Sequence, residues 1–223
     1  MRSQGGRVFV KICGITSVDD ARQAVDAGAD ALGFVFWPKS PRFVTPETAA
    51  AIATEVPPFV TRVGVFVEAS RDELFRTAER VGLDLLQLPG EVPREAGGPL
   101  PRRVLRALRV GPGFRTEDAL AWASAGAGLL LDTHRPDSPG GTGVAFDWAR
   151  VRDLRDRVPF LVLAGGLRAD NVAEAIAVVR PHAVDVSSGV ESSPGRKDEA
   201  KLRAFVEAVH AASREVSLGG APT

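Results

Sequence analysis

Eight short apolar runs, rich in β-branched residues, recur along the whole chain of 223 residues. Their starts lie 20 to 32 residues apart, and each run is followed by a segment with helical spacing. One strand, one helix and two turns fill such an interval, as parallel βα units require. The runs are continuously apolar, which is typical of strands covered on both faces. They span residues 7–12, 30–36, 60–67, 84–88, 104–110, 127–132, 159–164 and 183–186.

Helix signals stand between these runs. The pairs Ser17–Asp20 and Ser70–Glu73 have the spacing of capping boxes, which start helices. In Thr45–Glu47 a proline occupies the expected first helical position and an acid follows it. Gly28 and Gly82 stand where the first and third helices should end. These signals agree with a repeated strand–helix unit.

Eight βα units favour a closed barrel, because a doubly wound sheet usually stops at five or six strands. No Gly-x-Gly-x-x-Gly follows the first run, which counts against a dinucleotide fold. The segment 89–101 holds four prolines and three glycines. Proline costs about 3 kcal/mol inside a helix, so we expect the fourth helix to be short or missing. We predict an α/β protein with one (β/α)8 TIM barrel over residues 7–212 and flexible tails at 1–6 and 213–223.

Composition excludes several classes of function. The 28 basic residues balance 28 acidic ones, so no basic face for a nucleic acid is expected. No apolar stretch is long enough to span a bilayer, and the amino terminus does not have the pattern of a secretory signal. The single cysteine excludes an internal disulfide and suits the cytoplasm. The three histidines stand far apart, so we expect no metal.

Glycines and serines follow the last two runs. In a (β/α)8 barrel the active site lies where the strands end, and phosphate is commonly bound after the seventh and eighth strands. Glycine lets the backbone approach an anion closely, and serine hydroxyls add donors. The expected ligand is a phosphorylated small molecule, and the alternative is that these residues only form tight turns. The residues are Gly165, Gly166, Ser187, Ser188 and Gly189.

Four other side chains stand at or near the predicted strand ends. Cys13 closes the first run, where it is either a buried core residue or a reactive group. Asp132 closes an apolar run; burial there raises a carboxyl pKa toward neutrality and suits a general acid, and the alternative is a cap or surface ion pair. Arg42 suits a substrate carboxylate unless it is a surface arginine. Asp185, inside the eighth run, faces the barrel mouth or serves as a structural anchor.

Motifs in a fixed order cover the chain from about residue 7 to residue 210. They are Lys11–Thr16, Gly33–Phe36, Ser40–Arg42, Val63–Phe66, Leu130–Asp132, Gly140–Gly143 with Phe146–Trp148, Leu163–Leu167 with Asn171–Val172, and Asp185–Glu191. In order and spacing this set resembles the phosphoribosylanthranilate isomerase family.

The resemblance implies an Amadori rearrangement in tryptophan biosynthesis, without cofactor or metal. The reaction converts N-(5-phosphoribosyl)anthranilate to 1-(2-carboxyphenylamino)-1-deoxyribulose 5-phosphate. The resemblance implies that Asp132 is the general acid and Cys13 the general base. It further implies that Arg42 holds the anthranilate carboxylate, that Asp185 contacts the substrate and that the last two loops bind phosphate. We expect a monomer or a homodimer.

One position departs from the family pattern. The family usually has Gln-Leu-His-Gly after the fourth strand, whereas this chain has Pro89 in place of the histidine. Proline supplies neither a side-chain donor nor a backbone N–H, which affects any contact made from this loop. Two alternatives stay open: another phosphosugar isomerase or epimerase, and a decayed barrel that binds a phosphorylated ligand without turnover. The glycines of Gly140–Gly143 are expected in a lid or in the phosphate site.

Overall fold

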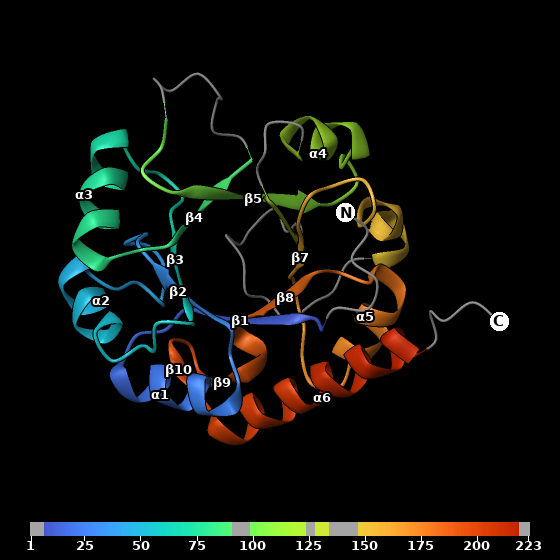
Figure 1. The fold of residues 1–223 in the computed structure, drawn as a ribbon. Helices are drawn as coiled ribbons and strands as arrows, with labels where there is room; N and C mark the ends of the chain where they lie inside the picture. The colour runs from blue at the N-terminus through green and yellow to red at the C-terminus, as the bar shows by residue number, and fades with distance from the viewer. Residues whose placement is uncertain (1–6, 91–98, 124–127, 134–146, 219–223) are drawn as a thin grey trace.

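The computed structural model describes residues 7–90, 99–123, 128–133 and 147–218. Eight parallel strands close into a barrel in chain order, with β1 pairing with both β2 and β8 (Figure 1). The predicted barrel is confirmed, and every strand begins within two residues of its predicted run. The strands are β1 (Phe9–Cys13), β2 (Ala31–Val35), β3 (Thr61–Val65), β4 (Leu85–Pro89), β5 (Arg103–Val110), β6 (Gly128–Thr133), β7 (Leu161–Leu163) and β8 (Ala183–Val186).

Helices surround the barrel on the outside (Figure 1). Between β4 and β5 the described residues, 90 and 99–102, form no helix, while 91–98 lie outside the described part. Between β6 and β7 the described helix is a 3₁₀ helix. Within the described ranges no helix has the length and apolar character needed to cross a membrane. The helices are α1 (Val18–Ala27), α2 (Pro46–Ala53), α3 (Arg71–Val81), α4 (Thr116–Ala123), η1 (Trp148–Leu154), α5 (Val172–Val179), η2 (Ser188–Val190) and α6 (Glu199–Leu218).

The predicted helix ends have the expected local geometry. The hydroxyl of Ser17 accepts a hydrogen bond from the Asp20 N–H, and Ser70 does the same for Glu73. These bonds satisfy N–H groups that have no partner inside the helix. Gly28 and Gly82 end α1 and α3 in the left-handed conformation, with φ of 105° and 67°. Local sequence signals therefore determine where these helices begin and end.

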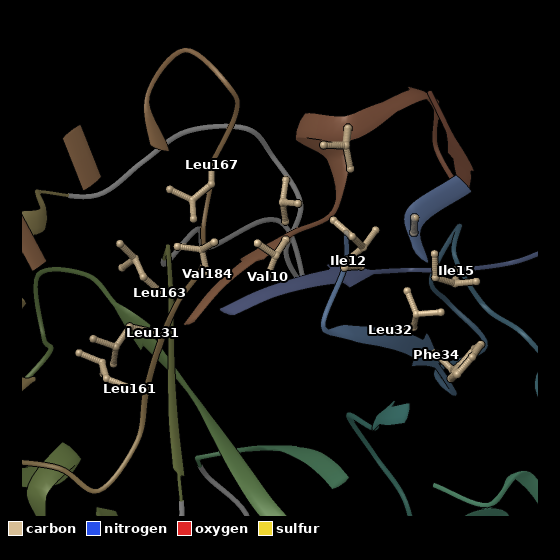
Figure 2. Packing of buried hydrophobic residues seen from close by; sticks show 14 of the residues in the cluster. Val10, Ile12, Ile15, Leu32, Phe34, Leu131, Leu161, Leu163, Leu167 and Val184 are labelled. Atoms are coloured by element: carbon tan, nitrogen blue, oxygen red, sulfur yellow. The ribbon is translucent and has the colours of Figure 1, made fainter. Parts of the chain in front are cut away.

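Alternating side chains divide the apolar core into two layers. Val10 and Ile12 of β1, with Leu32 and Phe34 of β2, belong to the large cluster between the strands and the helices (Figure 2). All four are fully buried, and burial of each such side chain stabilises the fold by about 1.5–3 kcal/mol. Residues of the opposite parity fill the barrel interior below its mouth: Leu85, Leu105, Ala107, Leu130, Val162, Ala164 and Ala183. Polar side chains of this inner parity therefore lie above an apolar plug.

The segment after β8 differs from the prediction in two ways. A short antiparallel hairpin, β9 (Glu191–Ser193) and β10 (Arg196–Lys197), precedes α6 and was not predicted. The predicted start of a flexible tail at Ser213 is wrong, because α6 continues to Leu218. Ser213 is buried, and its hydroxyl accepts a hydrogen bond from the N–H of Val8. This bond joins α6 to the chain just before β1; the other predicted tail, residues 1–6, lies outside the described part.

Candidate active site

A cavity of about 150 Å³ lies at the carboxyl ends of the strands, and residues of β1 to β4, β6 and β8 and of the loop after β7 line it. Its lining includes all nine site residues predicted from the sequence, which come from separate segments of the chain. They are Cys13, Arg42, Asp132, Gly165, Gly166, Asp185, Ser187, Ser188 and Gly189. Gln87 of β4 and Trp37, in the loop after β2, also line it. The structure therefore brings the predicted residues together in one place.

Cys13 ends β1 inside the barrel, two positions after Lys11, and both side chains are buried. The ammonium of Lys11 lies 2.8 Å from a carboxylate oxygen of Asp185, its partner across the β1–β8 register. Burial raises the pKa of the Cys13 thiol above its usual value, because it disfavours the thiolate. The charge of Lys11 opposes this rise. The thiol therefore lies among charges that favour and oppose its ionisation.

Asp132 lies at the other side of the cavity, at the end of β6. One carboxylate oxygen accepts a 2.7 Å hydrogen bond from the N–H of Thr133. Burial raises the pKa of Asp132 to about 6, and the negative charge of Asp185 adds to the rise. Gly165 has a φ of +86°, and a Cβ there would lie 2.9 Å from the Asp132 carboxylate. Glycine at this position allows the loop after β7 to close against a carboxyl that is partly protonated near neutral pH.

Arg42 lies in the loop after β2 and makes a bidentate ion pair. Its Nε and one terminal nitrogen donate to Glu191 at 2.8 and 2.7 Å. A Cβ on Gly14 would lie 2.5 Å from the Arg42 stem, so this glycine makes room for the side chain. An arginine carries five N–H donors, and the contacts of the described residues use two of the guanidinium donors for Glu191. The predicted partner of Arg42 was a substrate carboxylate, whereas the structure adds a protein carboxylate that orients it.

Glu191 also contacts Lys197 of the β9–β10 hairpin. The buried ammonium of Lys197 lies 2.9 Å from Glu191 and 2.6 Å from the backbone carbonyl of Cys13. Burial favours the protonated form of Glu191, but hydrogen bonds from Arg42 and Lys197 keep the pKa of Glu191 below its usual value. Asp20 extends this network, since its carboxylate accepts the N–H of Lys197. The network ties the loops after β1, β2 and β8 together.

The loops after β7 and β8 meet closely at the cavity. Gly166 also has a left-handed φ, 69°, and its carbonyl accepts a hydrogen bond from the Asn171 side chain. A Cβ on Gly189 would collide with the carbonyl oxygen of Leu167, so the two loops require glycine here. The buried hydroxyl of Ser187 has no hydrogen-bond partner among the described residues. It lines the cavity and is available to a ligand.

Four residues near the predicted machinery were missed by sequence reasoning. Lys11 and Gln87 share the inner parity of their strands with Cys13 and Leu85, and this parity was a usable signal. The buried Oε1 of Gln87 has no partner within the described part of the chain. The other two residues, Glu191 and Lys197, lie in the β9–β10 hairpin after β8, and no periodicity in the sequence predicts this hairpin. The predicted lid or phosphate loop, residues 140–143, lies outside the described residues.

Fold and site together define a (β/α)8-barrel enzyme with its active site at the carboxyl-terminal face of the strands. Residues 10–208 match the model of the N-(5'-phosphoribosyl)anthranilate (PRA) isomerase family. This chain belongs to that family. The predicted resemblance and the predicted isomerase function in tryptophan biosynthesis are thereby confirmed.

Individual relatives agree with this assignment. The N-(5'-phosphoribosyl)anthranilate isomerase of Pseudomonas putida is 55% identical over 200 residues, which cover 89% of this chain and 96% of the relative. The phosphoribosyl anthranilate isomerase structure from Thermotoga maritima is 45% identical, with a TM-score of 0.83 over 92% of this chain and 99% of that one. Another solved isomerase holds reduced 1-(o-carboxyphenylamino)-1-deoxyribulose 5-phosphate; it is 44% identical, with a TM-score of 0.80 and coverage of 92% and 99%.

Proposed function

We propose that the cavity at the barrel mouth isomerises N-(5'-phosphoribosyl)anthranilate with Asp132 as general acid and Cys13 as general base. The observation that carries this proposal is the joint lining of one cavity by a thiol, a carboxyl and the loops after β7 and β8. The pKa of about 6 for Asp132 leaves part of this group protonated near neutral pH. A protonated carboxyl is what ring opening of a glycosylamine requires.

In the first step the Asp132 carboxyl gives its proton to the ring oxygen of the ribose. The bond between C1 and that oxygen breaks, and the nitrogen lone pair forms a C1=N double bond, giving a protonated Schiff base. The Cys13 thiolate then removes the proton from C2. The C2–H electron pair forms a C1=C2 double bond, and the C1=N pair returns to nitrogen. The resulting enol tautomerises to the ketone, so no oxidant or reductant is needed.

The other site residues hold the substrate in this proposal. Arg42, oriented by Glu191, binds the anthranilate carboxylate through guanidinium donors that Glu191 does not use. The phosphate is bound by the loops after β7 and β8, and the hydroxyl of Ser187 is one donor. Asp185 contacts the substrate from β8. The Oε1 of Gln87, which has no hydrogen-bond partner among the described residues, is an acceptor for a ribose hydroxyl or the anthranilate N–H.

The test is an activity assay on freshly generated phosphoribosylanthranilate, followed through the loss of its fluorescence. We expect Cys13→Ala and Asp132→Asn each to lower kcat about 10²- to 10⁴-fold, as removal of a general acid or base does. Full activity in Cys13→Ala would exclude the thiol as the base. A wild-type protein no faster than both variants would favour the alternative, a barrel that binds a phosphorylated ligand without turnover.

We also propose that the barrel is a single catalytic domain, that it is cytoplasmic and that it is a monomer or a homodimer. Membership of a family of isomerases of tryptophan biosynthesis supports the location. A related structure is described as monomers generated from a dimeric isomerase, so both states occur among relatives. Analytical ultracentrifugation over a range of protein concentrations distinguishes the two states for this chain.

A further inference from the structure

Lys11 is a buried cation that the proposed reaction does not use. It is 4% exposed, and it is not among the described residues that line the cavity. Lysine is almost never buried to this degree unless it is paired. Its partner, Asp185, is also buried, and the two heads lie 2.8 Å apart inside the barrel. A buried ion pair is weak evidence that the pair stabilises the fold, because the cost of removing both charges from water can exceed their attraction. The side chain next to the pair offers another role for it.

That neighbour is Cys13, and Gly33 of β2 makes room for both side chains. Gly33 pairs with Cys13 in the β1–β2 register. A Cβ on Gly33 would lie 2.9 Å from the Cys13 sulfur and 3.2 Å from the Lys11 ammonium. Any larger residue would therefore displace the thiol, the ammonium or both. The missing side chain of Gly33 leaves one space that the sulfur and the ammonium share.

Four charged groups act on the sulfur from the elements packed around it. Lys11 from β1 and Lys197 from β10 favour the thiolate, and Arg42 from the loop after β2 interacts with it favourably. Asp185 from β8 disfavours it. Of these charges Lys11 has the strongest influence on Cys13. Asp185 in turn keeps Lys11 protonated: burial alone would lower the pKa of Lys11, but the Asp185 charge raises it above its usual value.

We propose that Lys11 is a positioning residue that stabilises the thiolate of Cys13, and that Asp185 holds the ammonium beside the sulfur. This inference rests on the proposed role of Cys13 as the base. When the thiolate takes the C2 proton, its negative charge is lost, and the Lys11–Asp185 pair remains as a neutral unit. The pair thus gives the buried base a cation without leaving a net charge in the barrel after proton transfer.

The test uses the absence of any other cysteine in the chain. Alkylation by iodoacetamide, followed by mass spectrometry across a pH series, reports the ionisation midpoint of Cys13 alone. We expect Lys11→Met to raise this midpoint by about one to three pH units, the range typical of a lost opposite charge nearby. Asp185→Asn should lower it, because it removes a negative charge and leaves the ammonium. A role limited to packing would not move the two midpoints in opposite directions.

Circular dichroism and the midpoint of the urea-unfolded chain identify a variant that fails to fold. If Lys11→Met fails, the double variant Lys11→Met/Asp185→Asn avoids an unpaired buried carboxylate, and its midpoint should still lie above that of the wild type. A midpoint at or below the wild-type value in the folded lysine variant would overturn the proposal. The pH profile of kcat/KM tests the proposed function separately. If Lys11→Met moves the ionisation midpoint of Cys13 but leaves the alkaline limb of this profile unchanged, Cys13 is not the base. Lys11 would then still stabilise the thiolate.

Discussion

Buried ion pairs cross-link one side of the cavity mouth, whereas on the opposite side a backbone N–H and a glycine loop hold a carboxyl. The first, which we call the base side, comprises Cys13 and the pairs Lys11–Asp185, Arg42–Glu191 and Lys197–Glu191. The second, the acid side, comprises Asp132, Thr133 and Gly165. Both sides bury ionisable groups, but only the base side pairs its carboxylates directly with cations of the described residues.

This difference matches the protonation state that the proposed mechanism requires of each side. A thiol must lose its proton to act as a base, and nearby cations favour that form. A carboxyl must keep its proton to act as an acid, and burial without a directly bound cation favours that form. The cations around Cys13 thus offset part of the cost of burying a thiolate, while burial keeps part of the Asp132 carboxyl protonated near neutral pH. Five substitutions test this comparison.

The largest effect is expected for Glu191→Ala on the base side. The substitution leaves Arg42 and Lys197 without their shared carboxylate, and the side chain of Lys197 is fully buried. Breaking a buried pair in this way should lower the free energy of unfolding by about 3–5 kcal/mol. Urea denaturation measures the change. Glu55→Ala, which opens the exposed Arg22–Glu55 pair, should leave the midpoint close to the wild-type value; equal losses in both variants would contradict the buried network.

The next effect is expected for Gly165→Ala on the acid side. The added Cβ would collide with Thr133 and crowd the Asp132 carboxylate, at a φ that non-glycine residues rarely adopt. Displacement of the loop after β7 should lower kcat/KM about 10- to 100-fold, as small misplacements of reacting groups do. Gly113→Ala is the matched control, because nothing lies within 4 Å of a Cβ at that position. The fluorescence assay compares them, and a fall of the same size in Gly113→Ala would contradict the steric explanation.

Asp132→Asn should lower activity and raise stability. The folded chain holds this carboxyl at a pKa of about 6, above the ordinary value of 3.8, so the folded state binds the proton more tightly than the unfolded state. Stability therefore falls as pH rises from about 4 to about 6 and then stays constant. At pH 7.5 the neutral asparagine should raise the free energy of unfolding by about 1–3 kcal/mol. Urea denaturation at pH 4 should show little difference between the proteins, and a stabilisation independent of pH would contradict the raised pKa.

Particular residues explain what the sequence made predictable. The eight strands and the positions of Cys13 and Asp132 follow from continuous apolar runs that end in a polar side chain, a local pattern. Gly28 and Gly82 end helices through backbone conformation, which is also local. The Arg42–Glu191 pair joins residues 149 positions apart, and its geometry depends on a hairpin that no periodicity predicts. Lys11 lies inside the first apolar run, and no local pattern predicts its proposed role, because that role depends on the neighbouring strands β2 and β8.

The smallest effects concern Gln87 and Pro89, two positions of the same parity in β4, on the border between the two sides. Pro89, which replaces the usual histidine, does not line the cavity of about 150 Å³, but it lines an adjoining larger cavity together with Gln87 and Asp132. Pro89→Ala should lower the free energy of unfolding by about 0.4–1 kcal/mol, because alanine gives the unfolded chain more conformational freedom than proline does. It should leave kcat/KM unchanged.

Gln87→Met should have the opposite pattern. It removes a buried acceptor that has no partner among the described residues, so the free energy of unfolding should rise by about 1 kcal/mol. The value of kcat/KM should fall about two- to tenfold, because one hydrogen bond to the substrate is lost. Urea denaturation and the fluorescence assay measure both quantities for both variants. A loss of activity in Pro89→Ala but not in Gln87→Met would contradict this expectation. The substrate would then contact Pro89 at the end of β4 rather than the side-chain amide of Gln87, and the acid side would include Pro89.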